Sequence, residues 1–415
     1  MNRGKQLAIA TISALCAATP MPSWAEQLRI LTSMPPSFYT PFVTAFEAHH
    51  PQTDVIVLNK NTNASVDELL RGNERRFDIF WASSPEPFVL LQQNDLVALH
   101  PDGTQAVHPF AYSAFGWAQR ASDAVPISLD WDSLLDPALA GKIAMARPSR
   151  SGSTHMMLER FFQVRGWHEG WAYLLELSAN LSTLTARSFT VLDGVASGRF
   201  EMGLTIDFLA HSHQGEPLSL TYGNPAMVTA ARLAVLRDGQ SRTAADLFAG
   251  FVTSDDGQRL LLTPEIARTP YVAKIRAASD APYHQVLEDA LALTWMEYDA
   301  PLASARYWAV NALFDAFVSE PFARRQSVWA RLRRLEAAHW PSDRAALLEV
   351  RRLLTTMPVT EAQLGVEGTA TNSGAFVALS EQQSARMTQW RTLSHSQLDA
   401  AELALSKIED QGVKQ

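Results

Sequence analysis

Residues 27–58 read QLRILTSMPPSFYTPFVTAFEAHHPQTDVIVL. Residues 27–32 (QLRILT) are typical of a strand, and after a Pro-rich turn Phe38, Phe42 and Phe46 recur at helical spacing. Residues 54–58 predict a second strand. Two strands separated by a helix within so short a stretch favour an α/β sheet with helices on its faces.

The same alternation continues toward the C-terminus. The sequence predicts strands at 77–82, 111–119, 142–146, 182–185, 200–206 and 227–236, with helices between most of them. Their nearly continuous apolar residues indicate a sheet that is buried on both faces. After about residue 281 the strand signals disappear, and the pattern predicts a helical C-terminal region.

Composition limits the class of protein. The 415 residues are 47% hydrophobic and 19% charged, which is typical of a soluble globular chain. The net charge of −8 argues against a general nucleic-acid binder, which would normally be basic. Cys16 is the single cysteine, so neither a disulfide framework nor a cysteine zinc site can be built.

The first 25 residues have the pattern of a secretory signal. Arg3 and Lys5 precede an uncharged apolar run, and Ser23-Trp24-Ala25 offers small residues for cleavage before Glu26. The apolar run is too short to span a bilayer, which takes roughly 20 residues. We therefore expect an exported periplasmic chain that does not span the membrane; a lipoprotein site at Cys16 is the alternative.

Polar residues that directly follow predicted strands mark the expected ligand site, because ligands of open α/β sheets bind beyond the carboxyl ends of the strands. Hydroxyls and free N–H groups at helix N-termini form an anion site, and Arg150 or Arg187 can add charge-assisted hydrogen bonds. The alternative is that each serine or threonine only caps a helix. The predicted ligand-binding residues are Ser33, Ser83, Ser84, Ser151, Gly152, Ser153, Thr154, Arg187, Ser188 and Asp207.

No catalytic motif is present. The sequence lacks a GxxxxGK[ST] phosphate loop and a GxSxG nucleophile elbow, and no nucleophile–base pair stands out. His211 and His213, near Glu216, fit a helix end better than a metal site. We therefore predict a non-enzymatic protein that has no metal and no cofactor.

Several segments resemble bacterial periplasmic solute-binding proteins of the ferric and phosphorylated-compound branch. The most specific is WDSLLDPALAGKI at 131–143; FDIFWASSPEPF at 77–88 and TAADLFAGFVTSDDGQRLLL at 243–262 support it. Within that branch, residues 153–189 look most like phosphoglycerate transport regulatory proteins. The resemblance implies a type II fold of two α/β lobes joined by hinge strands, with the ligand in the cleft between them.

The resemblance also sets expectations for domains, ligand and partners. Iron-binding members hold the metal with adjacent tyrosines, and this sequence has no Tyr-Tyr pair. A small anionic, phosphorylated metabolite presented to ABC importer membrane subunits is therefore expected. The expected division is a signal peptide (1–25), lobe 1 (26–120), lobe 2 (121–235), the return of lobe 1 (236–300) and a helical extension (301–415).

Two other functions stay open from the sequence: an adaptor that regulates a membrane sensor kinase, and a secreted hydrolase on the same fold. The adaptor function would depend on the helical C-terminal region. Trp295, Trp308 and Trp329 are expected to pack on lobe 1, and the arginines between 324 and 352 to lie on a solvated helix face. The helix after Ser380 is expected either to bind a partner or to fold back over apolar surface.

Overall fold

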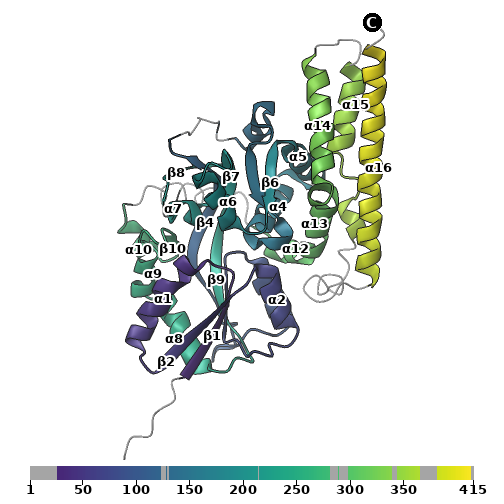
Figure 1. The fold of residues 1–415 in the computed structure, drawn as a ribbon. Coiled ribbons are helices and arrows are strands. Elements are labelled where there is room, and N and C mark those ends of the chain that lie inside the picture. The colour runs from purple at the N-terminus through teal and green to yellow at the C-terminus, as the bar shows by residue number, and fades with distance from the viewer. Residues whose placement is uncertain are drawn as a thin grey trace, which may run out of the picture.

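The computed structural model describes residues 26–122, 128, 130–213, 215–280, 288, 298–338, 344–364 and 381–412. The predicted signal peptide and Trp295 lie outside these ranges. One mixed sheet in two halves carries the α/β part of the chain, and the C-terminal helices stand beside its second half (Figure 1).

The first half of the sheet is built mainly from the N-terminal strands. β1 (Glu26–Thr32) lies between β2 (Thr53–Asn59) and β3 (Ile79–Ala82), parallel to both, and β9 (Val228–Val235) pairs antiparallel with β3. All four residues of β3 are buried, as expected for an apolar strand covered on both faces. The helices around this half are α1 (Pro36–His49), α2 (Thr62–Leu70), α3 (Glu86–Gln93), α8 (Arg242–Thr253), α9 (Asp255–Leu260) and α10 (Ala273–Ala277).

The second half repeats this arrangement. β5 (Ile143–Ala146) pairs in parallel with β6 (Leu181–Thr185) and β7 (Met202–Ile206). Short 3-10 turns lie at Trp131–Leu135, Pro137–Leu139, Pro148–Arg150 and Ser178–Asn180. The helices of this half are α4 (Gly152–Arg165), α5 (Trp167–Leu177), α6 (Ser188–Ala196) and α7 (Asp207–His211).

A single long strand joins the halves. β4 (Val107–Arg120) pairs with β9 through Val107–Ala114 and then, from Phe115 on, with β7 and with β8 (Leu218–Tyr222). β10 (Thr269–Pro270) adds a short antiparallel pair to β4. The sequence predicted β4 only as 111–119 and missed β8 and β10, because these strands are short or polar and are fixed by their partners in the sheet.

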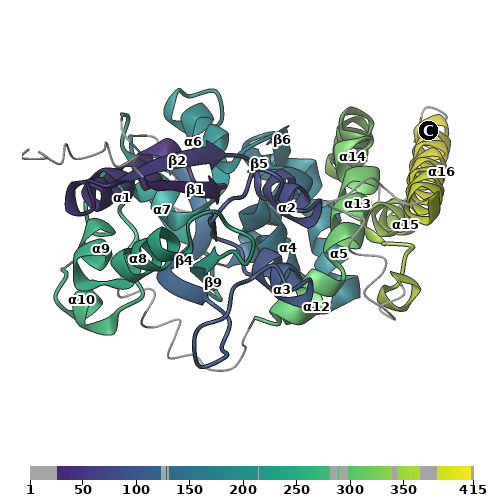
Figure 2. The ribbon, with the colours of Figure 1, turned by 90° about the horizontal axis from the view of Figure 1, so that it is seen from below.

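The C-terminal helices pack on the second half. α12 (Ala300–Ala305), α13 (Tyr307–Phe314) and a π-helical turn (Asp315–Ser319) lead into α14 (Phe322–Ala337), α15 (Arg344–Thr355), a 3-10 turn (Glu361–Leu364) and α16 (Glu381–Gly412). α14, α15 and α16 run side by side next to α5 (Figure 1). Figure 2 shows α12 beside α3, so this region also touches the first half.

Two expectations for this region are wrong. Trp329 packs with α15, α16 and Ala179 of the second half rather than on the first, while the ring centroid of Trp308 lies 5.4 Å from that of Trp390 of α16. Arg325, expected on a solvated face, is fully buried and donates to Ser178 Oγ at 2.8 Å. Spacing indicates which residues share a helix face, but it does not say which neighbour covers that face.

α16 folds back over apolar surface, which was one of the two expectations for it. Its stripe of Leu398, Ala401, Leu405 and Ile408 is buried in a cluster with α14 and α15. Ion pairs from Arg324 and other arginines of α14 to carboxylates of α16 border that cluster. The apolar stripe is therefore occupied within the chain.

Candidate ligand-binding cleft

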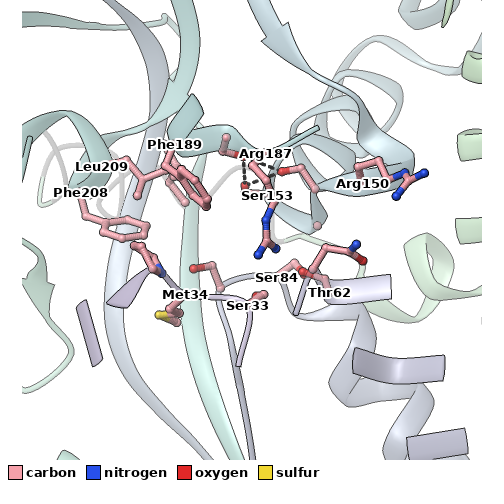
Figure 3. A pocket seen from close by; sticks show the side chains of 17 residues that line it. Ser33, Met34, Thr62, Ser84, Arg150, Ser153, Arg187, Phe189, Phe208 and Leu209 are labelled. Carbon is pink, nitrogen blue, oxygen red and sulfur yellow. Dashed lines mark hydrogen bonds between the residues drawn. The ribbon is translucent and has the colours of Figure 1, made fainter. Parts of the chain in front are cut away.

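A cleft lies where the carboxyl ends of the strands of the two halves meet (Figure 3). Its residues follow β1, β2 and β3 on one side and β5, β6 and β7 on the other, as the rule for open sheets predicts. The cavity of about 60 Å³ has room for a few water molecules. It is lined by Ser33, Met34, Pro35, Asn61, Thr62, Ser83, Ser84, Arg150, Ser151, Gly152, Ser153, Arg187, Ser188, Phe189, Ile206, Phe208 and Leu209.

Three serine hydroxyls form a triangle on the second-half wall. Ser151 Oγ lies 2.7 Å from Ser188 Oγ and 3.1 Å from Ser153 Oγ, and the last two atoms are 3.3 Å apart. Ser151 Oγ also accepts from the N–H and Oγ1 of Thr154, so its own hydrogen is donated within the triangle. The hydroxyl hydrogens of Ser153 and Ser188 can then point toward an acceptor in the cleft.

Two helices begin at this triangle. Ser151 caps α4 by accepting from the backbone N–H of Thr154 at 3.2 Å, and α6 begins at Ser188 with no side-chain cap. The free N–H groups and the dipole at the start of each helix favour negative charge, by about 0.3–1 kcal/mol for each charge at an exposed helix end. The wall is therefore electropositive before any charged side chain is considered.

Arg187 brings a formal positive charge into the cleft. Its Nη2 donates to Asn59 Oδ1 at 2.8 Å across the gap, and the guanidinium lies 5.5 Å from the ring of Phe189. Among the described residues it belongs to no ion pair, and partial burial lowers its pKa. An anion in the cleft would supply the negative charge that Arg187 lacks there.

Across the gap, the first half offers a hydroxyl with no partner. Ser84 is 2% exposed, and within the described part of the chain its Oγ has no hydrogen-bond partner. A Cβ on Gly152 would lie 2.5 Å from that oxygen and 2.9 Å from Thr62 Oγ1, so only glycine allows the two walls to approach this closely. A buried hydroxyl without a partner is costly, so this oxygen has a hydrogen bond to offer to a ligand group.

The structure brings eight of the ten predicted residues together in this cleft. Thr154 lies behind the cleft lining, where its N–H and its Oγ1 both donate hydrogen bonds to Ser151 Oγ. Asp207 is also buried in the wall, where its carboxylate accepts from the backbone N–H groups of Ala114 and Phe208 at 2.9 and 2.6 Å. Burial raises its pKa to about 6, and its oxygens are taken up by the fold rather than presented to the cleft.

Some lining residues were missed by the sequence analysis. Asn61 and Thr62 follow β2, so the rule of polar residues after strands would have found them had it been applied to that strand. The apolar lining of Met34, Phe208 and Leu209 carries no sequence signal that separates it from the core.

The comparisons agree with this architecture. The family described as bacterial extracellular solute-binding protein matches residues 33–262, which contain both walls of the cleft. The chain belongs to this family. It is a solute-binding protein with the type II two-lobed fold, and its family consists of binding proteins rather than enzymes.

One curated relative is similar over most of the chain. The phosphoglycerate transport regulatory protein PgtC of Salmonella typhimurium is 30% identical over 358 residues, covering 82% of this chain and 88% of the relative. This match is longer than residues 33–262, so it also takes in sequence outside the family match.

Solved structures show the same fold at low identity. The periplasmic binding protein AfuA from Actinobacillus pleuropneumoniae, solved with fructose-6-phosphate, has a TM-score of 0.59 at 19% identity, covering 70% of this chain and 98% of its own. The apo ferric ion-binding protein A of Pasteurella haemolytica has a TM-score of 0.56 at 12% identity, with 70% and 97% covered.

Among the described residues, no helix is long and apolar enough to cross a membrane, and no three His, Cys, Asp or Glu side chains are grouped as metal ligands.

Proposed function

We propose that this solute-binding protein captures a small anionic, phosphorylated metabolite in the cleft and presents it to the membrane subunits of an ABC importer. In this proposal residues 1–25 are a cleaved signal, the mature protein works in the periplasm, and the ligand is released unchanged. Arg187 carries the proposal, because it is a partly buried cation that belongs to no ion pair of the described residues.

The rest of the lining suits a phosphate or carboxylate group. Two helix N-termini, the serine triangle and the unpartnered Ser84 hydroxyl all offer donors to an anion. No tyrosine is among the residues that line the described cleft, which does not favour ferric iron. The names of two similar proteins point the same way, since one concerns phosphoglycerate and the other was solved with fructose-6-phosphate.

Calorimetry with phosphoglycerates, sugar phosphates, organic acids and phosphonates tests the proposal. At 100 times its dissociation constant a true ligand adds about 2.7 kcal/mol of apparent stability, so thermal shifts can rank the panel first. Loss of a charge-assisted bond costs about 1.5–3 kcal/mol, so Arg187→Ala should weaken binding roughly tenfold to a hundredfold. Ser153→Ala should weaken it less.

The matched control is Arg237→Ala, which removes an exposed arginine that pairs with Asp95 and does not line the cleft. It should bind like wild type. Wild-type affinity in both Arg187→Ala and Ser153→Ala would reject the site, and turnover of a phosphate ester would reject the binding-protein assignment.

A ligand-sensing adaptor for a membrane sensor kinase is the second candidate, favoured by the word "regulatory" in the name of PgtC. The exposed faces of the C-terminal helices offer a surface for it, since Leu348 and Leu403 are 57% and 58% exposed. Leu403→Asp tests this role. Lost ligand-dependent transcription with unchanged ligand affinity would support the adaptor, and unchanged transcription would favour the importer.

A further inference from the structure

A second arginine lies directly beneath the cleft. Arg268, just before β10, is 1% exposed, and its guanidinium lies 4.2 Å from the ring centroid of Phe208 and 5.6 Å from those of Phe38 and Phe110. Phe208 itself lines the cleft. A cation among aromatic faces is held firmly in position, although the rings neutralise little of its charge.

Two of the hydrogen-bond partners of Arg268 are residues of the cleft lining. Its Nη2 donates to Ser83 Oγ at 3.3 Å, and its Nη1 contacts Met34 Sδ at 3.6 Å. Since Ser83 Oγ accepts from the arginine, its own hydrogen can point toward the cleft. Arg268 thus fixes Ser83 as a donor for an acceptor group in the cleft.

The charge of Arg268 is incompletely balanced. It belongs to no ion pair in the described part of the chain, and its Nε has no hydrogen-bond partner. Burial lowers its pKa to about 9, opposed only by the charge of Asp207. Both carboxylate oxygens of Asp207 accept hydrogen bonds from backbone N–H groups, so part of that negative charge is already compensated by the backbone. An isolated buried cation is costly unless a counter-charge arrives.

We propose that Arg268 determines specificity for ligands with a doubly charged phosphate or sulfate group, acting through Ser83 as a positioning residue below the cleft while Arg187 contacts that group from the other wall. This inference rests on the proposed function. A singly charged ligand would neutralise Arg187 alone, whereas a phosphate dianion would also offset the charge below the first-half wall.

Two substitutions that should change ligand affinity in opposite directions test this role. Arg268→Gln removes the charge but keeps a donor, and 3-phosphoglycerate should bind it roughly tenfold to a hundredfold more weakly. Asp207→Asn removes the opposing charge, and both 3-phosphoglycerate and inorganic sulfate should bind about twofold to tenfold more tightly. The affinity for glycerate, which carries one charge, should change less in both variants than the affinity for 3-phosphoglycerate.

The asparagine variant separates electrostatics from packing. An amide cannot accept from both backbone N–H groups, so Asp207→Asn should lower the melting temperature while it tightens binding. Structural damage alone would weaken binding. If Arg268→Gln fails to fold, Asp207→Asn still decides, because unchanged or weaker binding of sulfate and 3-phosphoglycerate overturns the inference.

The remaining outcomes distinguish failure of the inference about Arg268 from failure of the proposed function. If Arg187→Gln weakens 3-phosphoglycerate binding while Arg268→Gln does not, the inference is overturned and the proposed function stands. If Arg268→Gln weakens glycerate and 3-phosphoglycerate equally, Arg268 serves packing only, and the inference is again overturned. If neither sulfate nor any phosphorylated probe binds wild type, the proposed function itself fails.

Discussion

At the scale of single residues, Gly152 sets how closely the two walls of the cleft can approach. A methyl group at this position would meet Ser84 Oγ and Thr62 Oγ1 of the opposite wall, although both are far away in sequence. The glycine is needed for the spacing between walls, since no unusual φ is recorded for it. Two-lobed binding proteins close around ligands by hinge motion, so a side chain at this position would oppose closure.

We therefore predict that Gly152→Ala weakens ligand binding while the free protein keeps its melting temperature. Overpacking costs about 1–3 kcal/mol, which corresponds to roughly fivefold to 150-fold in affinity. Calorimetry with the tightest ligand of the panel measures it. Gly250→Ala is the matched control, because a Cβ there meets nothing within 4 Å. Equal affinities in the two variants would contradict the prediction.

Glu86 is a second residue whose surroundings predict a measurable effect, a dependence of protein stability on pH. It is 1% exposed, accepts from the Tyr298 hydroxyl, and has one carboxylate oxygen without a partner in the described structure. Burial raises its pKa to about 8, while the Tyr298 bond acts in the opposite direction. A carboxyl whose pKa is raised on folding holds its proton longer in the folded chain than in the unfolded one.

The raised pKa has a definite consequence for stability. Between about pH 4.5 and 8 the unfolded chain releases this proton and the folded chain retains it, so stability falls as the pH rises through that window. Glu86→Gln removes this loss. Its melting temperature should exceed that of wild type increasingly from pH 5 to 8, with Glu169→Gln, a change at an exposed glutamate, measured beside it as the control. A pH-independent gain in Glu86→Gln would refute the assignment.

At the scale of elements, α16 is held by its apolar stripe more than by its ion pairs. The pairs around Arg324, Arg331 and Arg334 are partly exposed, and exposed pairs are worth about 0–1 kcal/mol each. A fully buried leucine side chain contributes about 1.5–3 kcal/mol. The stripe therefore decides whether the helix stays attached.

Two leucines of α16, two residues apart, provide a matched test. Leu405 is fully buried, so Leu405→Ala should destabilise the protein by about 2–5 kcal/mol. Leu403 is 58% exposed, so Leu403→Ala should stay within about 0.5 kcal/mol of wild type. Urea unfolding measures both. Similar midpoints for the two variants would mean that α16 is not packed in solution as it is here.

At the scale of the whole molecule, the start of the C-terminal region bridges the two halves of the sheet. The Tyr307 hydroxyl donates to Asn63 Oδ1 of α2 at 2.7 Å, and Asn63 Nδ2 donates to the Ser149 carbonyl of the second half at 2.7 Å. On the second half, His155 Nδ1 lies 3.0 Å from Asn311 Oδ1 of α13. These bonds span the cleft next to Ser151, so they should form fully only when the halves are closed.

Tyr307→Phe should therefore weaken ligand binding, because it removes a bond of the closed form and keeps the ring. A neutral hydrogen bond contributes about 0.5–1.5 kcal/mol, or roughly twofold to tenfold in affinity. Calorimetry measures the change, with Tyr39→Phe on α1 as the control. A lower melting temperature with unchanged affinity would show that the bond persists in both forms and does not report closure.

The sequence alone predicted most of the elements and the polar residue types of the candidate site. Apolar runs and helical spacing predicted most of the strands and helices, since these patterns reflect which side of each element is buried. The motif 131–143 was also recognisable from its own residues. Asp136 caps the turn that follows it, and Trp131 is buried. Polar residues after strands identified most of the polar lining of the cleft, because the carboxyl ends of parallel strands share one edge of a sheet.

Only the tertiary structure decided how those pieces meet. Asp207 and Ser83 both follow strands, yet one is consumed by backbone N–H groups and the other faces the cleft. Arg268, buried below that cleft, and Arg325, buried under α15, look like ordinary surface arginines in the sequence. Their surroundings come from segments distant in sequence, and burial of a long charged side chain depends on those neighbours rather than on any local pattern.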